Sequence, residues 1–371
     1  MKRTIILLTI FFLSWGILLA QTAGEYIENG NAKLKLKDYK GAITEYDNAI
    51  QIDTANAEAY FYRGTAKYYL GEKQDAIYDY SKAIELNPNY AAAYYNLGSI
   101  KSELGFKQGA IADFDKVIQL NPTYAEAYFS RGNAKSDFGN KQGAIADWDI
   151  AIELNPDYTS AYYNRGTVKK DFGDIQSAIA DFDKTIALNP QHEKAYYNRG
   201  LLKYALGDKK AAIADYNKAI EINPKDAEAY NNRGVVKYDL GDKSAVADYT
   251  KAIELNPKYS VAYNNRGNMK KALGKNQESL DDYNKAIEVN AKYADAYISR
   301  GNLRADMGNK QGAIADYDKA LEINPNDAVV YNNRGNVKKD SGDKQGACMD
   351  WQIALELGYK DANNNIEKYC K

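Results

Sequence analysis

Apart from its carboxylates, this 371-residue chain has few side chains that could do chemistry. It contains one histidine, His192, and two cysteines, Cys348 and Cys370. A structural zinc site needs four Cys or His ligands, and a Ser-His-Asp relay or a Cys-His pair needs a histidine beside its nucleophile. We therefore expect no catalytic residue, no metal site and no cofactor, and we predict that the protein is not an enzyme.

The overall composition narrows the class of protein further. With 45% hydrophobic and 27% charged residues, the chain is predicted to fold and not to be disordered. The 49 basic and 50 acidic residues give a net charge of −1, so no global positive field attracts nucleic acid. The 33 tyrosines are a large excess of one aromatic type, which indicates a position that is used repeatedly.

The prolines reveal a repeat of 34 residues. Five of them are evenly spaced at this interval, one follows after 33 residues, and the last lies two periods further on: Pro88, Pro122, Pro156, Pro190, Pro224, Pro257 and Pro325. Extending this frame gives ten repeats over residues 23–361. Within each repeat, position 4 is tyrosine, position 8 is glycine and position 24 is aromatic, and position 15 is glycine in nine of the ten.

The conserved positions of the frame predict two helices per repeat. A glycine in a helix interior costs about 1 kcal/mol relative to alanine, so the glycine at position 8 indicates close approach of a second helix. The glycine at position 15 suits a left-handed turn after the first helix. The Asn-Pro pair at positions 31 and 32 ends the second helix, because the residue before a proline avoids helical geometry.

These residues closely resemble the tetratricopeptide repeat, a family of helix-turn-helix units. The resemblance implies an all-α, right-handed superhelical solenoid whose first helices line a concave groove, and it implies protein or peptide binding as the usual role. Residues 362–371 carry Ile366 and Tyr369 as an apolar edge, so we predict that they form a C-terminal capping helix. Capping is expected because a terminal repeat lacks a neighbour.

Charged residues also follow the repeat. Position 7 is mostly arginine, position 11 is always basic, and position 23 is aspartate except in the first repeat. We expect ion pairs between the two helices of a repeat, because positions 7 and 11 share one helix face. One carboxylate per repeat does not make the dense oxygen cage that calcium needs, so we predict no metal there.

A stripe of asparagines and aromatic residues lies beside the packing face of each first helix. We predict that this stripe lines the groove and contacts a ligand. The predicted groove residues are Phe61, Tyr95, Phe129, Tyr163, Tyr197, Asn231, Asn264 and Asn332 at position 5, Asn96, Asn164, Asn198, Asn232, Asn265 and Asn333 at position 6, and Asn133, Asn268, Asn302 and Asn336 at position 9. The alternative is that the asparagines are copies of one ancestral repeat and that the aromatic residues pack between repeats.

The stripe predicts a non-catalytic scaffold that binds an extended segment of a partner protein. An asparagine amide both donates and accepts, which suits pairing with a peptide backbone, and aromatic residues at position 5 would take apolar side chains in the N-terminal half. Acidic residues at position 13 favour a basic or neutral peptide. The competing hypothesis is a glycan-binding module, because tyrosines and asparagines also stack on and hydrogen-bond to sugars.

The first twenty residues suggest export. Lys2 and Arg3 precede an apolar stretch over residues 4–20, which is the order of a secretory signal peptide. The alternative is an uncleaved N-terminal anchor, and only then would the chain contact a membrane. We predict a periplasmic or extracellular protein, in which Cys348 and Cys370 form a disulfide in an oxidising environment.

Overall fold

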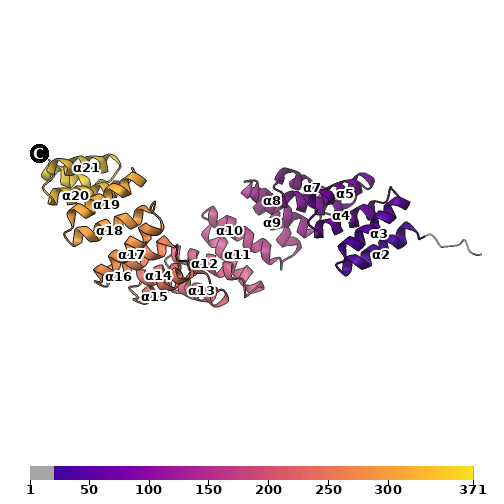
Figure 1. Cartoon of the computed structure of the whole chain (residues 1–371), viewed down its shortest axis with the longest axis horizontal. Coiled ribbons are helices and arrows are strands. Elements are labelled where there is room, and N and C mark those ends of the chain that lie inside the picture. The colour runs from indigo at the N-terminus through magenta and orange to yellow at the C-terminus, as the bar shows by residue number, and fades with distance from the viewer. Residues whose placement is uncertain (1–20, 371) are drawn as a thin grey trace, which may run out of the picture. The chain divides into compact units, whose positions relative to one another are not determined.

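The computed structural model describes residues 21–370, so the predicted signal segment, residues 1–20, lies outside the described residues. Over this range the chain is built from helices joined by short turns, without a strand. Residue contacts divide it into two compact units, unit 1 up to Phe172 and unit 2 from Gly173 onward. Figure 1 labels the helices of both.

The part of unit 1 that the structure describes, residues 21–172, contains nine helices. They are α2 (Ala23–Lys35), α3 (Tyr39–Ile52), α4 (Ala57–Tyr69), α5 (Lys73–Leu86), α6 (Ala91–Glu103), α7 (Lys107–Leu120), α8 (Ala125–Asp137), α9 (Lys141–Leu154) and α10 (Thr159–Asp171). Each even-numbered helix is the first helix of a predicted repeat, and each odd-numbered helix is the second. The expected helix-turn-helix pattern is therefore present.

Unit 2 continues the pattern and ends with one additional helix. Its helices are α11 (Ile175–Leu188), α12 (Glu193–Ala205), α13 (Lys209–Ile222), α14 (Ala227–Asp239), α15 (Ala245–Leu255), α16 (Ser260–Ala272), α17 (Asn276–Val289), α18 (Ala294–Asp306), α19 (Lys310–Ile323), α20 (Ala328–Asp340), α21 (Lys344–Glu356) and α22 (Ala362–Tyr369). Helix α15 has 11 residues where α13 has 14, because the turn before it carries the single deletion of the repeat. All helices in the described range are too short or too polar to span a bilayer.

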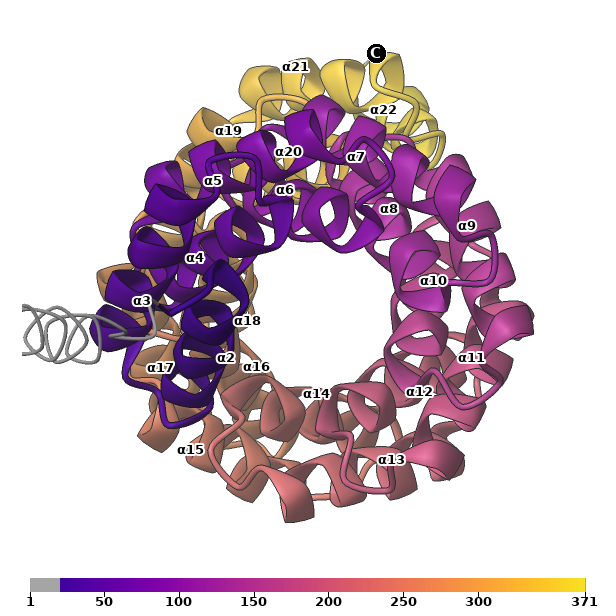
Figure 2. The same cartoon turned by 90° about the vertical axis from the view of Figure 1, so that its right-hand side faces the viewer.

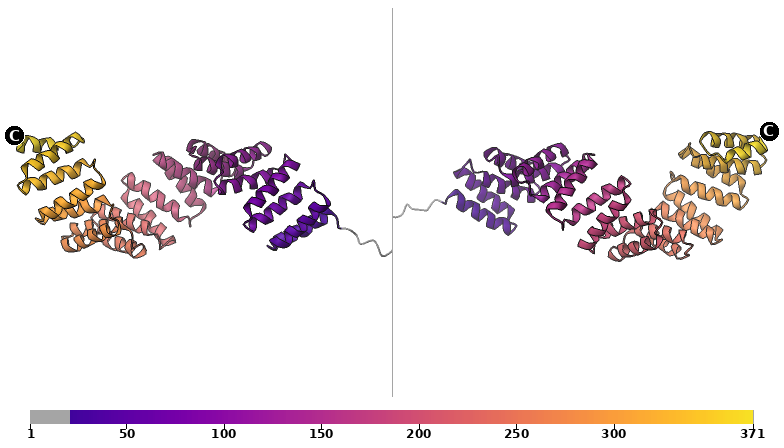
Figure 3. Two further views of the ribbon diagram at one scale, coloured as in Figure 1. Left: turned by 45° about the horizontal axis from the view of Figure 1, so that its top comes forward. Right: turned by 180° about the vertical axis from the view of Figure 1, so that it is seen from behind.

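Each unit has two layers of helices. Within each unit, every helix packs against its neighbours in sequence, and the helix pairs stack side by side (Figure 3). Within unit 2, each even-numbered helix also contacts the next even-numbered one from α12 to α20. Within each unit the even-numbered helices up to α20 lie on the inner side of the curve and the odd-numbered helices on the outer side (Figure 2). The inner layer is therefore the concave face of each unit.

The glycine at position 8 allows the two helices of a repeat to approach closely. A Cβ atom on Gly132 would lie 2.7 Å from the indole nitrogen of Trp148, and one on Gly234 would lie 2.7 Å from the ring of Tyr249. Such distances are shorter than a van der Waals contact, so a larger residue would push the helices apart. The predicted reason for this glycine is confirmed.

The turn between the two helices also follows the sequence signals. The glycine at position 15 has a positive φ in each repeat that carries it, for example +86° at Gly71, and Lys37 adopts φ 61° where the first repeat lacks the glycine. The next residue is commonly an N-cap: the carboxylate of Asp208 accepts a hydrogen bond from the Ala211 amide at 3.0 Å. Capping satisfies an amide that has no partner within the helix.

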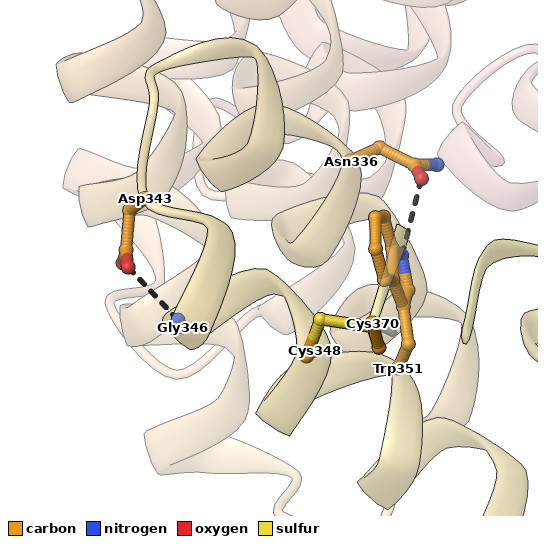
Figure 4. The surroundings of a disulfide bond; sticks show 6 residues. All are labelled: Asn336, Asp343, Gly346, Cys348, Trp351 and Cys370. Carbon is orange, nitrogen blue, oxygen red and sulfur yellow. Dashed lines mark hydrogen bonds between the residues drawn. A yellow bond between two sulfur atoms is a disulfide. The ribbon is translucent and has the colours of Figure 1, made fainter. Parts of the chain in front are cut away.

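The last helix, α22, packs on α21 and is joined to it by a disulfide between Cys348 and Cys370, whose Cα atoms are 5.7 Å apart. Figure 4 shows Trp351 beside this disulfide, with its indole nitrogen directed at Asn336. The ring of Tyr369 lies 5.8 Å from that of Trp351. Helix α22 therefore covers the apolar surface that the final helix pair would otherwise leave exposed.

Candidate functional site

The candidate site is the concave face of each unit, where positions 5, 6 and 9 of the even-numbered helices meet. Unit 1 and unit 2 are treated separately. In both, side chains at these positions connect adjacent even-numbered helices. The contacts between repeats decide which of their atoms face the surface.

In unit 1 the aromatic residues at position 5 pack against the tyrosine at position 34 of the same repeat, which directly precedes the next even-numbered helix. The ring of Phe61 lies 4.8 Å from that of Tyr90, the ring of Phe129 lies 4.6 Å from that of Tyr158, and Tyr95 packs in the same way. All three are half-buried. Part of each ring is covered by the tyrosine at position 34. The sequence prediction missed these tyrosines, although their spacing in the repeat was a usable signal.

Four of the predicted groove residues lie in the interior of unit 2. Asn198, Asn231, Asn264 and Asn332 are 7%, 3%, 4% and 8% exposed. Their assignment as ligand contacts is wrong, since the neighbouring even-numbered helices approach closely at this level and cover them. A buried amide must find hydrogen-bond partners inside the protein, and most of them do.

Several asparagines of unit 2 form a chain of hydrogen bonds across three helices. The Asn265 amide donates to the Asn231 carbonyl oxygen at 3.0 Å, and the Asn231 amide donates to the Asn232 oxygen at 3.2 Å. The Asn232 amide donates to the Tyr197 hydroxyl at 2.8 Å, which in turn donates to a Glu228 carboxylate oxygen at 3.2 Å. Along this chain each residue donates a hydrogen bond to the next, and the last acceptor is the carboxylate of Glu228. In such an arrangement each hydrogen bond polarises and strengthens the next one.

The asparagines at position 9 accept hydrogen bonds from the aromatic residue at position 24. Trp148 donates to Asn133 at 3.2 Å, and Tyr283 donates to Asn268 at 2.7 Å. Asn302 and Asn336 accept from Tyr317 and Trp351 in the same way. These asparagines therefore have a structural role, because each provides a hydrogen-bond acceptor for the hydroxyl or indole N–H of a buried aromatic side chain. The sequence contains the signal, because position 9 is asparagine only in repeats whose position 24 is tyrosine or tryptophan.

Tyr216 shows what happens when this pairing is broken. Its repeat has Leu201 at position 9, and the Tyr216 hydroxyl has no hydrogen-bond partner among the described residues. Burial raises the pKa of Tyr216, so the hydroxyl stays protonated. An unpaired buried hydroxyl lowers stability, and this site is consequently a weak point of unit 2.

The asparagines at position 6 that remain at the surface are fixed through their amide nitrogen. Asn164 donates to the Asn133 oxygen at 2.9 Å, Asn96 donates to the Tyr80 hydroxyl at 3.2 Å, and Asn333 donates to the Asn302 oxygen at 3.4 Å. Each bond reaches back to the preceding repeat. Within residues 21–370 no protein group donates to the side-chain oxygen of these asparagines, which are half-buried.

Two hollows open on the concave face of unit 1, two repeats apart and at equivalent positions. The first, about 180 Å³, lies between α4 and α6 and is lined by Thr65, Tyr68, Tyr69, Tyr80, Asn96, Ser99 and Ile100. The second, about 390 Å³, lies between α8 and α10 and is lined by Asn133, Ser136, Asp137, Trp148, Tyr163, Asn164, Thr167 and Val168. The first has no charged residue in its lining, whereas the second includes one carboxylate.

The predicted ion pairs between the helices of a repeat are present, and they extend to the preceding repeat. Arg131 forms two hydrogen bonds to the Asp147 carboxylate, at 2.6 and 2.9 Å, and a third to Asp115 at 2.6 Å. Lys135 also contacts Asp147 at 2.8 Å, and the guanidinium lies 5.4 Å from the ring of Tyr128. A buried carboxylate held by two cations is a structural element, and no group of acidic, Cys or His side chains in the described range is arranged to hold a metal.

The acidic residues at position 13 also have partners. Lys107 pairs with Asp137 at 2.9 Å and Lys141 pairs with Asp171 at 2.8 Å, each lysine coming from the preceding repeat. Exposed pairs of this kind contribute about 1 kcal/mol or less to stability. They do reduce the negative charge of the groove, so the preference for a basic peptide is weaker than the sequence suggested.

Together these features define an all-α scaffold of tandem helix pairs with a concave face. Models described as TPR repeat and tetratricopeptide repeat match most of the chain, at residues 30–71, 64–105, 91–124, 159–192, 201–241, 227–259, 248–281, 267–308, 294–327 and 316–349. The chain belongs to the tetratricopeptide repeat family, whose members are generally non-catalytic scaffolds that bind proteins or peptides.

Two solved structures agree with this fold, and a third protein is similar in sequence over part of the chain. A tetratricopeptide repeat protein from Parabacteroides merdae is 24% identical, with a TM-score of 0.55 over 67% of this chain and 99% of that one. The Cut9-Hcn1 hetero-tetramer of APC/C has 13% identity and a TM-score of 0.52, covering 98% and 99%. MamA is 30% identical over 44% of this chain and 96% of its own, with a TM-score of 0.42. A comparison with curated proteins gives no match.

Proposed function

We propose that the protein is a non-catalytic scaffold whose concave face binds an extended segment of a partner protein. The observation that carries this proposal is the state of the surface asparagines at position 6. The amide nitrogens of Asn96 and Asn164 are bonded to the preceding repeat, and their side-chain oxygens remain available as acceptors. Backbone N–H groups of an extended peptide are suitable donors for such acceptors.

The bonds to the preceding repeat orient these oxygens before a ligand arrives. A side chain that is already held in one rotamer loses less entropy on binding, so its hydrogen bond adds more to affinity. This arrangement recognises a backbone and not a particular sequence. Sequence preference would then come from side chains that enter the hollows between even-numbered helices.

The two hollows of unit 1 favour different side chains. The tyrosine-lined hollow between α4 and α6 has an uncharged lining and suits an apolar side chain. The hollow between α8 and α10 has Asp137 and two asparagines in its lining and suits a polar or basic side chain. No contact favours the glycan alternative in particular, because the position 5 rings are covered on one side by neighbouring tyrosines.

The test is affinity capture from an extract of native source cells, with bound proteins identified by mass spectrometry. The wild type is compared with a triple variant, Asn96→Ala, Asn164→Ala and Asn333→Ala. The matched control carries Lys218→Ala, Lys251→Ala and Lys319→Ala on odd-numbered helices, and all three proteins must show equal helicity. We expect a protein captured by the wild type and the lysine control to be lost from the asparagine variant. Equal capture by all three would place binding elsewhere.

Export is a further part of this proposal. It is supported by the basic and then apolar order of residues 1–20 and by the disulfide that joins Cys348 to Cys370, since disulfides persist mainly in oxidising compartments. Cell fractionation followed by N-terminal sequencing tests it. We expect the protein in the envelope or medium, starting near Gln21. Recovery from the reducing cytosol with residues 1–20 attached would contradict export.

A further inference from the structure

A third hollow lies outside the concave face. It has a volume of about 650 Å³ and sits at the turn edge of unit 1, where Gln74 and Ile77 of α5, Lys101 of α6, residues 105–109 at the start of α7, and Phe138 meet. None of the predicted groove residues lines it. Its walls come from three consecutive repeats, so it is built by the stacking of the repeats and not by one turn alone.

The residue that distinguishes this hollow is Phe106. It occupies position 16, where most other repeats have an aspartate, asparagine or glutamate, and where Asn140 and Asp208 cap the helix that follows. Phe106 makes no side-chain cap and is 59% exposed, while Phe138 across the hollow is 52% exposed. An exposed ring in place of a capping group acts against local stability. Such departures from a local rule are typical of functional positions.

The polar lining of the hollow consists of hydrogen-bond donors and amides, without a carboxylate. Its charged residues are Lys101, which bonds Asp113 at 2.7 Å, and Lys107, which bonds Asp137 at 2.9 Å and the Ser102 carbonyl at 2.8 Å. An ammonium group has three N–H donors, so both lysines keep at least one. The side-chain amides of Gln74 and Gln108 add further donors.

We propose that this hollow docks a segment of a partner protein in which an aliphatic or aromatic side chain stands next to an acidic one. The apolar side chain would lie between Phe106 and Phe138 above Ile77, and the carboxylate would accept hydrogen bonds from Lys101 and Lys107. Aromatic residues in a partly enclosed pocket are common hot spots of protein interfaces. This docking site is separate from the concave face and does not depend on the function proposed for it.

The experiment selects peptides against the full chain. Random twelve-residue peptides displayed on phage are selected on immobilised wild type and counter-selected on Phe106→Asp. We expect the recovered peptides to share a Leu, Ile or Phe beside an Asp or Glu. The most enriched peptide, synthesised with a fluorescent label, should bind the wild type at least tenfold more tightly than Phe106→Asp, and its affinity should fall as salt is raised.

The variants are chosen so that loss of binding is not loss of folding. Phe106→Asp introduces the capping residue of other repeats, so it should fold at least as well as the wild type. Leu206→Asp, at an exposed turn position of unit 2, and the triple asparagine variant of the concave face should bind the peptide as the wild type does. The proposal is overturned if no peptide is enriched, if enriched peptides lack acidic residues, or if Phe106→Asp binds equally well.

Discussion

Units 1 and 2 share one backbone pattern but join their repeats by different interactions. In unit 1, aromatic residues at position 5 pack against the tyrosine at position 34 of the same repeat, at the start of the next even-numbered helix, as Phe61 does with Tyr90. In the first half of unit 2, the equivalent space holds the hydrogen-bond chain that includes Asn231 and Asn265. The same junction is therefore apolar in one unit and polar in the other.

The arginines at position 7 differ in a similar way. In unit 1 their second partner in the preceding repeat is an aspartate, as with Arg131 and Asp115. In the middle of unit 2 that partner is neutral, as with Arg266 and the Thr250 hydroxyl at 3.2 Å. The backbone and the glycines therefore set the spacing of the helices in both units, while the side-chain interactions between repeats differ. Unit 2 relies more on directional bonds, which fail as a group when one is removed.

The largest effect is expected from the buried carboxylates at position 23. Asp282→Ala should cost about 3 to 5 kcal/mol, because Arg266 and Lys270 lose their shared partner and Arg266 keeps only a neutral one. Asp147→Ala should cost about 2 kcal/mol less, since Arg131 retains Asp115. Hydrogen exchange of the flanking helices measures both. Equal losses would show that the second partner contributes nothing.

The second-largest loss of stability is expected when the position 5 residues are replaced. Phe129→Ala is expected to cost about 2 to 3 kcal/mol, less than a fully buried phenylalanine, and Phe129→Leu less than about 1.5 kcal/mol. Asn231→Ala should cost about 1 to 2 kcal/mol, because Asn265 and Asn232 each lose a partner. A double-mutant cycle of Asn231→Ala with Asn265→Ala, followed by urea unfolding, should show coupling. Strict additivity would argue against a cooperative chain.

The tyrosines at position 24 provide a smaller, matched test. Tyr80→Phe in unit 1 should cost about 1 kcal/mol, because the hydroxyl bonds Thr65 at 3.1 Å and accepts from Asn96. Tyr216→Phe in unit 2 should be neutral or slightly stabilising, because its hydroxyl has no partner in the described range. Thermal unfolding of both variants checks the difference. A similar loss in the two would mean that an unseen partner, such as water, serves Tyr216.

Helix capping gives effects of opposite sign in the two units. Phe106→Asp in unit 1 is expected to stabilise by about 1 kcal/mol, because it supplies the missing cap of α7. Asp208→Ala in unit 2 is expected to destabilise by about 1 kcal/mol, because it removes the cap of α13. Denaturant midpoints at constant slope measure both. An unchanged midpoint for Phe106→Asp would indicate that the ring stabilises the folded chain in another way.

The smallest effect is a pH dependence confined to unit 2. Burial, together with the neighbouring Asp226, raises the pKa of Glu193 to about 7, and Lys194 opposes the rise. The folded state then binds a proton that the unfolded state has released, so stability falls as pH rises from about 4.5 to about 7. Melting temperatures at pH 5 and pH 8 should differ less in Glu193→Gln than in the wild type or in the exposed control Glu221→Gln. An identical dependence in all three would exclude Glu193 as its source.

Local features were the most predictable from the sequence. The period of 34, the glycine at position 8 and the turn glycine are each tied to a conformation or a close contact within one repeat, and the structure has all three. The ion pairs of position 23 with positions 7 and 11 were predictable for the same reason. The asparagines at positions 5, 6 and 9 were recognised as a stripe, but the ligand-contact role given to Asn198, Asn231, Asn264 and Asn332 was wrong.

The sequence by itself determined the helix pairs, their turns and the family, because these depend on residues close together in the chain. Only the tertiary structure decided which atoms of the asparagine stripe remain at the surface. Asn164 bonds a residue 31 positions earlier and Asn265 one 34 positions earlier, so their partners depend on how neighbouring repeats stack. That stacking decides whether an amide is exposed or is buried and hydrogen-bonded, and no local pattern encodes it.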